Sequence, residues 1–177
     1  MSAGETAGVE IRPARPRDAR SFLDLWTEAL GEGLVRVDRP ELSAAEVRRR
    51  FRRSLTADDA EFVAAAGGAV VGHLLISRER SAAARHVATL SVVVARAWRR
   101  RGIGSALLRE GIAWARERGV EKLLLSVYPH NGAALALYRS FGFEEEGRLA
   151  RHSRTSYGDL DEILMASWIG IDGGDAG

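Results

Sequence analysis

One segment constrains the fold of this chain more than any other, the run from Val92 to Ser105. It opens with three consecutive valines, a composition typical of a buried strand. Three arginines and the sequence Gly102-Ile103-Gly104 follow, and from there apolar residues recur at helical spacing. The segment therefore predicts a strand, a short basic turn and an amphipathic helix over residues 102–118, which is a building unit of an α/β or α+β domain.

The first turn of such a helix is suited to bind an anion. Its backbone N–H groups have no partner inside the helix, and the helix dipole is positive there, which suits a pyrophosphate. Gly102 and Gly104 leave room for phosphates to approach, and Arg99, Arg100 and Arg101 supply positive charge. The pattern lacks the Gly-Lys-Ser/Thr ending of a Walker A loop and the third glycine of the Rossmann fingerprint. A tight strand-to-helix turn without a ligand is the alternative.

Periodicity and turn residues predict the remaining elements. The expected strands cover residues 9–13, 61–66, 69–77, 87–95, 122–127, 143–149 and 161–168, and the expected helices cover residues 16–30, 43–55, 102–118 and 132–141. Gly67-Gly68 predicts a hairpin, and Ser43 with Glu46 forms a capping-box pattern. We expect a mixed sheet with helices on both faces, its last two strands antiparallel.

Length and composition indicate one globular domain. The chain has 177 residues, of which 46% are hydrophobic and 28% charged. We expect a domain over residues 9–169, with disordered ends at 1–8 and 170–177. No apolar run approaches the roughly 20 residues that span a bilayer, and the first residues lack a signal-peptide pattern. The expectation is a cytoplasmic protein without a membrane partner.

The charge and the cysteine content limit the kinds of site and partner that this chain can have. Cysteine is absent, which excludes disulfides, thiolate nucleophiles and cysteine-ligated zinc, and we expect no metal site. The net charge is +2, and Lys122 is the only lysine. Arginines gather at positions 48–53 on one side of the second helix, opposite Val47 and Phe51. A solvated face is the first interpretation, with an acidic partner or cofactor phosphates as alternatives. Nucleic acid is not expected without a broader basic patch.

Two ordered motifs resemble a known family. The pattern Arg99-x-x-Gly102-x-Gly104 after a valine-rich strand resembles motif A of the GCN5-related N-acetyltransferase (GNAT) superfamily. Residues 131–143, which contain Asn131, an Ala-Leu-Tyr sequence and a Gly-Phe pair, resemble that family's later motif. The resemblance extends over residues 9–169. It implies a mixed, mostly antiparallel sheet with splayed middle strands, and acetyl-CoA as the cofactor.

The resemblance also implies a role for each matching residue. The residues expected to bind the cofactor are Val92, Val93, Val94, Arg99, Arg100, Arg101, Gly102, Ile103, Gly104, Ser105, Asn131 and Tyr138. The three valines would pair with the pantetheine arm through their backbone. Asn131 would contact the pantetheine region, although asparagine is also a favoured helix N-cap. Tyr138 would be the general acid that protonates the leaving thiolate, because an unperturbed tyrosine pKa near 10 keeps it protonated at neutral pH; core packing is its alternative.

The base that deprotonates the amine is not identified. Family branches that acetylate protein N-termini carry a glutamate where this chain has Ser126, and histone-type members carry one near Ala88 and Thr89. By chemistry alone the candidates are His73, His86, His130 and His152, each with a surface or packing role as the alternative. Glu28 and Glu32, near the end of the first helix, are expected to shape the acceptor site.

These features predict an N-acetyltransferase in which an amine attacks the acetyl thioester directly. The closing strands are similar to those of members that act on small amines or amino acids, so a small-molecule acceptor is the first expectation. A protein N-terminal or lysine acetyltransferase, a non-catalytic acyl-CoA-binding module and a nucleic-acid binder using residues 48–53 are the alternatives. Members of the family often dimerise through their late strands, which makes a homodimer a state to test.

Overall fold

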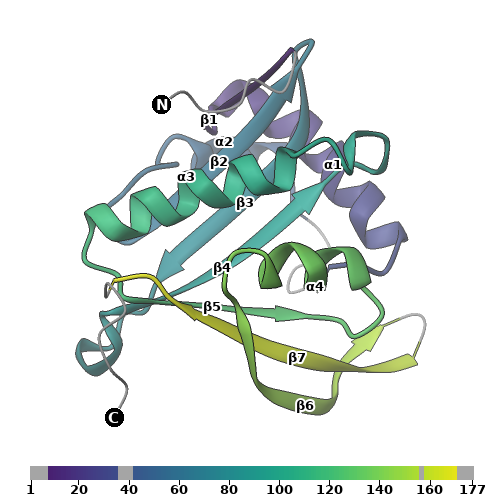
Figure 1. Cartoon of the computed structure of the whole chain (residues 1–177). Helices are drawn as coiled ribbons and strands as arrows, with labels where there is room; N and C mark the ends of the chain where they lie inside the picture. Colours follow the sequence, from purple (N-terminus) through teal and green to yellow (C-terminus); the bar gives the residue numbers. More distant parts are fainter. Residues whose placement is uncertain (1–7, 36–41, 156–157, 171–177) are drawn as a thin grey trace.

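The computed structural model describes residues 8–35, 42–155 and 158–170 (Figure 1). Residues 1–7 and 171–177, which make up most of the two ends expected to be disordered, lie outside the described residues. Residues 36–41 and 156–157 also lie outside them. Among the described residues, no helix has the length and apolar character that crossing a bilayer requires.

In the described part of the chain, seven strands form one mixed sheet. They are β1 (Val9–Pro13), β2 (Asp59–Ala66), β3 (Ala69–Arg78), β4 (Val87–Val94), β5 (Lys122–Val127), β6 (Glu144–Thr155) and β7 (Gly158–Trp168). Their order across the sheet is β1-β2-β3-β4-β5-β7-β6. Only the β4–β5 pair is parallel within these described strands. The prediction of a mixed, mostly antiparallel sheet with antiparallel closing strands is confirmed.

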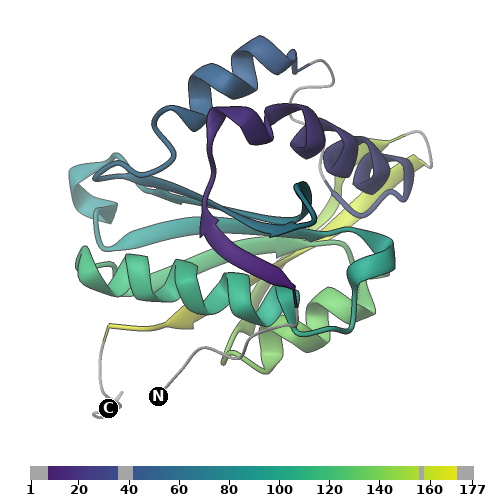
Figure 2. The same ribbon diagram turned by 90° about the horizontal axis from the view of Figure 1, so that it is seen from above.

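Four α-helices among the described residues cover the two faces of the sheet. They are α1 (Ala19–Gly31), α2 (Ala44–Phe51), α3 (Ile103–Glu117) and α4 (Gly132–Arg139). Seen from above, α1 and α2 lie over one face, and α3 and α4 lie over the other (Figure 2). Each face has its own apolar cluster, one containing Phe22 and Phe51, the other containing Leu107 and Leu123. The two clusters fix both helical layers against the sheet.

The late elements differ in length from the prediction. Helix α4 ends at Arg139 and not at Phe141, because Gly142 takes a left-handed φ of 77° and the N–H of Phe143 turns back to the Tyr138 carbonyl at 3.1 Å. Strand β6 runs on to Thr155 through two register shifts against β7. Its sequence is mostly exposed and polar, so no alternating pattern predicts its length.

The middle of the sheet is open. Strands β4 and β5 pair in only three places within these described strands, the last of them Thr89 with Leu124. Beyond that pair β4 continues against β3 as far as Val94, and β5 continues against β7 as far as Val127. The backbone of residues 90–94 therefore has a strand partner on one side only, which confirms the predicted splay.

Candidate active site

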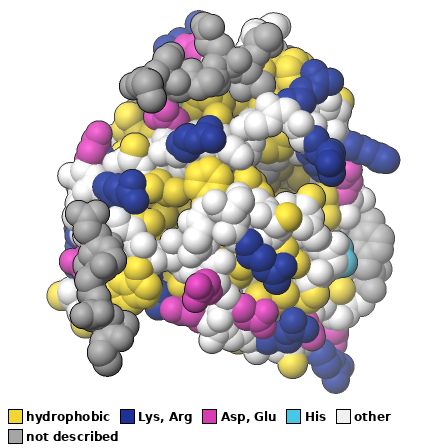
Figure 3. Space-filling view, viewed as in Figure 1, with side chains coloured by type: hydrophobic (Ala, Val, Ile, Leu, Met, Phe, Trp, Pro, Cys, Tyr) yellow, Lys and Arg dark blue, Asp and Glu magenta, His cyan; other side chains and the backbone are white. Residues whose placement is uncertain are grey.

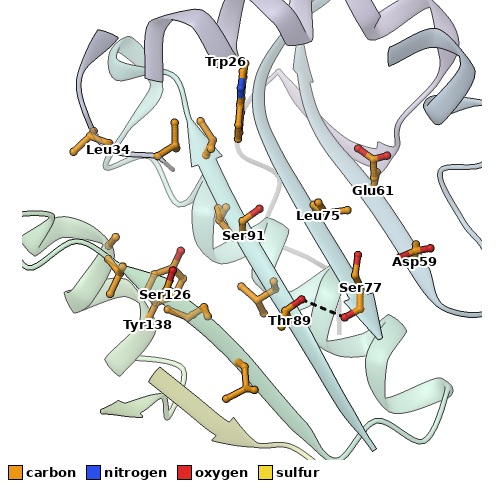
Figure 4. Close-up of a pocket in the computed structure, with 18 of the residues that line it drawn as sticks. Trp26, Leu34, Asp59, Glu61, Leu75, Ser77, Thr89, Ser91, Ser126 and Tyr138 are labelled. Atoms are coloured by element: carbon orange, nitrogen blue, oxygen red, sulfur yellow. Dashed lines mark hydrogen bonds between the residues drawn. The ribbon is translucent and has the colours of Figure 1, made fainter. Parts of the chain in front are cut away.

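A cleft of about 1150 Å³ lies where β4 and β5 separate (Figure 4). Rows of paired residues from neighbouring strands make part of its floor. In one row Glu61 of β2 is opposite Leu75 of β3, which is opposite Ser91 of β4. Trp26 of α1 points into the cleft from the helical layer above, and Tyr138 lies beside Ser126 on the far side.

Tyr138, the residue expected to be the general acid, lines the cleft, and its catalytic role stays a prediction. Only 5% of the residue is exposed, yet it lines the cleft beside the parted strands. Burial raises the pKa of Tyr138 to about 12, and a hydrogen bond with the backbone of Val92 opposes that rise in part. The phenol therefore keeps its proton throughout the neutral pH range and is available to donate it.

The three valines before the turn alternate between the two cores. Val93 is buried in the cluster beneath α1 and α2, whereas Val92 and Val94 pack against the cluster under α3 and α4. Their backbone pairs with β3 on one side and faces the splay on the other. The side chains of these valines pack in the cores while one edge of their backbone has no strand partner. That edge could pair with an extended ligand.

The glycine turn presents a bare helix N-terminus. Gly102, the N-cap of α3, has a φ of 78° and no side chain to cap the helix. The first bond of the helix runs from the Ala106 N–H to the Gly102 carbonyl at 2.9 Å. Among the described residues, no backbone carbonyl pairs with the N–H groups of residues 103–105. These groups, which include Ile103 and Ser105, fit a pyrophosphate.

Gly104 is constrained by the protein itself. A Cβ there would lie 2.9 Å from Leu137 Cδ2 of α4, closer than an ordinary contact. The glycine therefore lets α3 and α4 pack together beside the turn. Its absent side chain also keeps the first helical turn clear.

The three arginines of the turn are placed differently. Arg99 is half-buried; its Nε donates to the Val94 carbonyl at 3.0 Å and its guanidinium is ion paired with Glu32. Arg100 is exposed at a φ of 60°, and Arg101 is exposed with its guanidinium 5.0 Å from the Trp98 ring centre. Arg100 and Arg101 are therefore the two that can reach a phosphate directly, while Arg99 holds the turn.

Glu28 and Glu32 make contacts within the protein, and their expected part in shaping the acceptor site stays a prediction. Neither residue lines the cleft. Glu28 accepts a hydrogen bond from the Arg96 N–H at 2.6 Å, and Glu32 pairs with Arg99. Both carboxylates lie at the C-terminal end of α1 and hold the segment that leads into α3. These contacts join residues far apart in the chain, so local sequence patterns do not reveal them.

Asn131 serves as a helix cap and also lines the cleft. Its Oδ1 accepts a hydrogen bond from the Ala134 N–H at 3.2 Å, which caps α4. The same residue is among those that line the cleft. The capping alternative is therefore realised, and a contact with a bound cofactor stays a prediction.

No histidine lines the cleft in the part of the chain that the structure describes. His73 is buried, and its Nε2 lies 3.0 Å from Glu61 Oε2. His86 stacks on Trp168, His130 is exposed beside Tyr128, and His152 is exposed on β6. None of the four is placed to act as the base.

A buried charged cluster joins α2 to the sheet, and the sequence did not predict it. Glu61 Oε1 lies 2.8 Å from Arg50 Nε, while its other oxygen pairs with His73. The Arg50 guanidinium also lies 5.1 Å from the centre of the Phe22 ring. The signal was present, since β2 and β3 form a hairpin that directs both Glu61 and His73 toward the same face.

The arginines of α2 are more than a solvated face. Arg48, Arg49, Arg52 and Arg53 are all exposed, and of these Arg49 and Arg53 line the cleft together with the half-buried Arg50. Figure 3 shows the opposite side of the molecule, where basic side chains are interspersed with acidic and apolar ones. A nucleic-acid partner for residues 48–53 therefore stays an alternative from the sequence.

Comparison with known proteins agrees with this geometry. The acetyltransferase (GNAT) family profile matches residues 21–143. The chain is 34% identical over 110 residues to the L-amino acid N-acetyltransferase AaaT of Escherichia coli K12, a match covering 60% of this chain and 66% of that protein. It is 40% identical over 110 residues to the N-alpha-acetyltransferase RimI of Mycobacterium tuberculosis, covering 62% of this chain and 68% of that protein.

A solved structure shares the whole fold. The phosphinothricin acetyltransferase of Sinorhizobium meliloti, solved in complex with acetyl-CoA, has a TM-score of 0.82 and 25% sequence identity, covering 93% of this chain and 90% of that one. The splayed strands, the bare N-terminus of α3 and the matched sequence all lead to the same assignment. The chain belongs to the acetyltransferase (GNAT) family.

Proposed function

We propose that this protein transfers the acetyl group of acetyl-CoA to a primary amine. The observation that carries the proposal is the position of Tyr138, which lines the cleft together with Val92 at the point where β4 and β5 part. The bare N-terminus of α3 and the exposed Arg100 and Arg101 support binding of the pyrophosphate. The solved relative that holds acetyl-CoA supports the same cofactor.

Acetyl-CoA supplies the acetyl group as a thioester. The residues of this chain hold that group and manage the protons. The open backbone edge of Val92 to Val94 would align the pantetheine arm. A backbone N–H at that edge would stabilise the oxyanion of the tetrahedral intermediate. When the C–S bond breaks, the Tyr138 phenol would give its proton to the thiolate.

The acceptor we propose is a small α-amine, an amino acid in particular. One relative is named as an L-amino acid acetyltransferase. The cleft supports an acceptor with an anionic group, because Arg49 and Arg53 line it and no described residue pairs with either guanidinium. A protein N-terminus is the second candidate, supported by the relative named as an N-alpha-acetyltransferase.

Two measurements test this function. Calorimetric titration with acetyl-CoA, CoA and NADH should show binding of the first two only. A thiol-release assay should then compare the twenty proteinogenic L-amino acids with hexapeptides that start with alanine or serine. Turnover on free amino acids would support the small-molecule acceptor, and turnover on peptides alone would move the assignment to protein N-termini. Absence of acetyl-CoA binding would overturn the proposal.

A further inference from the structure

A carboxylate outside both family motifs lines the cleft. Glu162 belongs to β7, and only 1% of the residue is exposed. It is nevertheless among the residues that line the cleft, together with Ser126 and Tyr138. Ser153 of β6 donates a hydrogen bond from its hydroxyl to Glu162 Oε1. A buried carboxylate that borders a reaction cleft is costly to maintain, and such groups are frequently functional.

Strand register places Glu162 next to the parted strands. Ser126 of β5 is opposite Leu164 of β7, and Val127 is opposite Ile163. Side chains alternate between the two faces of a sheet, so Glu162 projects from the same face as Ser126 and Leu164. Diagonal neighbours across paired strands lie within about 7–8 Å, a distance that a glutamate side chain can largely span. Glu162 thus approaches the position where other branches of the family carry a glutamate and this chain has Ser126.

A second polar group lies at the same end of the cleft. Tyr128, which follows β5, is 4% exposed, and its hydroxyl makes no hydrogen bond to any residue that the structure describes. It lines the cleft, and continuation of the β5–β7 register brings it beside Glu162. An unsatisfied buried hydroxyl costs free energy unless a ligand brings it a polar atom. The orphan hydroxyl and the carboxylate therefore mark one polar end of the cleft.

We propose that Glu162 binds the ammonium group of the acceptor and takes its proton, and that Tyr128 makes a hydrogen bond to a polar atom beside that group. The inference rests on the proposed acetyl transfer, and it assigns the base that deprotonates the acceptor amine. It also narrows the acceptor to a primary amine with a neighbouring oxygen or nitrogen. Neither residue belongs to the motifs that identify the family.

The proposed step balances in atoms and charge. The ammonium group gives one proton to the Glu162 carboxylate, and the resulting amine lone pair forms the N–C bond to the thioester carbonyl. The intermediate then expels the thiolate as the C–S bond breaks, and Tyr138 protonates the sulfur. The amide nitrogen loses its second proton to the Tyr138 phenolate, and Glu162 releases the first proton to solvent. An N-acetyl product, free CoA and one proton leave, and both residues return to their starting states. No oxidant, metal or further reactant is required.

The surrounding groups leave Glu162 as the carboxylate best placed for this step. From β5 and the residues after it come Ser126 and Tyr128, and from β6 comes Ser153. Tyr138 on α4 and Glu146 on β6, which is ion paired with Lys122 of β5, also line the cleft. The exposed His130 stacks on Tyr128. The other charged or titratable side chains of the two paired strands are Glu144, Glu145, Arg148, Arg151, His152 and Arg154 on β6 and Asp159 and Asp161 on β7.

The first test uses Glu162→Gln in the full chain, with Glu144→Gln as the matched control. Glu144 is an exposed carboxylate on β6 that does not line the cleft. With the amino acid of highest turnover, kcat/KM of Glu162→Gln should fall about 100-fold or more, while the Kd for acetyl-CoA stays within about 2-fold. With p-toluidine, an arylamine whose amino group is uncharged at neutral pH, the loss should nearly vanish. Glu144→Gln should match the wild type throughout.

Two further variants separate a catalytic role from a structural one. Ser153→Ala removes the hydroxyl that holds the Glu162 carboxylate in place, so kcat/KM for the amino acid should fall while the Kd for acetyl-CoA stays within about 2-fold. Tyr128→Phe should raise KM for the amino acid about 5-fold or more and leave kcat nearly unchanged. A Glu162→Gln enzyme with the wild-type rate and pH profile would overturn this inference alone. Absence of turnover in the wild-type chain would overturn the proposed function, and this inference with it.

Discussion

The guanidinium of Arg99, at the centre of the basic turn, is ion paired with the carboxylate of Glu32 at the end of α1. An arginine that a motif match assigns to the phosphates is thereby committed to a contact within the protein. Its Nε also donates to the Val94 carbonyl, the last residue of β4. The pair thus links the helix above the sheet, the end of the central strand and the start of α3, and it fixes the geometry that the phosphate site needs.

This linkage can be measured by a double-mutant cycle. Glu32→Gln and Arg99→Gln should each lower the free energy of unfolding, and the double variant should lose less than their sum, with a coupling of about 1 kcal/mol. The pair is only partly exposed, so screening reduces the coupling without removing it. Urea denaturation at low and moderate salt checks the value. Additive single effects would show that the two side chains do not depend on each other.

Removal of the Tyr138 hydroxyl should affect turnover and spare binding. In Tyr138→Phe we expect kcat to fall roughly 10- to 1,000-fold, because the thiolate leaves without a positioned acid. Since the pKa of Tyr138 is about 12, the wild-type rate should show no alkaline decline from this group below about pH 11. Steady-state rates from pH 6 to 10 and calorimetric affinity for acetyl-CoA provide the measurements. An unchanged kcat would remove the assignment of the acid.

A negative side chain at the helix N-terminus should prevent binding of acetyl-CoA. Gly104→Glu places charge beside the free N–H groups and drives a Cβ toward Leu137, so the affinity for acetyl-CoA should fall about 100-fold or more. The control is Ala113→Glu, which adds the same charge at an exposed position further along α3. Calorimetry compares both variants with the wild type. Retained affinity in Gly104→Glu would mean that the phosphates bind elsewhere.

The buried pair of Glu61 and His73 should make stability depend on pH. Burial lowers the pKa of His73 below its ordinary 6.5, although the hydrogen bond to Glu61 opposes the shift. The unfolded chain then binds this proton more readily than the folded chain, so the free energy of unfolding falls as the pH drops below about 6.5. His73→Gln, which cannot take up the proton, should show a shallower decline, by up to about 1.4 kcal/mol per pH unit.

Urea denaturation of the wild type and His73→Gln at pH 7.5, 6.5 and 5.5 measures that difference. The control is His152→Gln, which changes an exposed histidine on β6. Its curve should run parallel to that of the wild type. If the curve of His73→Gln were equally parallel, His73 would not be the group that couples folding to protons.

Local patterns predicted the elements well where the periodicity was strong. The valine-rich strand, the helix that begins after Gly102 and the hairpin at Gly67 all follow from residues close together in the chain. The end of α4 was predicted two residues too late, because the return of the Phe143 N–H to Tyr138 depends on backbone conformation at Gly142. The length of β6 was not predictable, because its polar residues are held by pairing with β7.

The residues of the candidate site also differ in how far the sequence could predict them. Tyr138 and the glycine turn lie within contiguous motifs, so the sequence could single them out. Glu162 and Tyr128 meet only through the pairing of β7 with β5, which no local pattern encodes. The histidines show the opposite case, in which the sequence suggested a candidate that the structure does not support. Chemistry made His73 a candidate base, but burial against Glu61 gives it a structural partner instead.

The splay between β4 and β5 has a consequence for the cellular abundance of the protein. Strands β4 and β5 share three residue pairs. The pantetheine arm of acetyl-CoA, bound between these strands, would therefore add hydrogen bonds that the protein alone does not have. A ligand that binds only the folded chain stabilises it in proportion to the logarithm of its concentration. When the supply of acetyl-CoA falls, the protein would then unfold and be degraded more readily, and the amount of enzyme would follow the metabolic state of the cell.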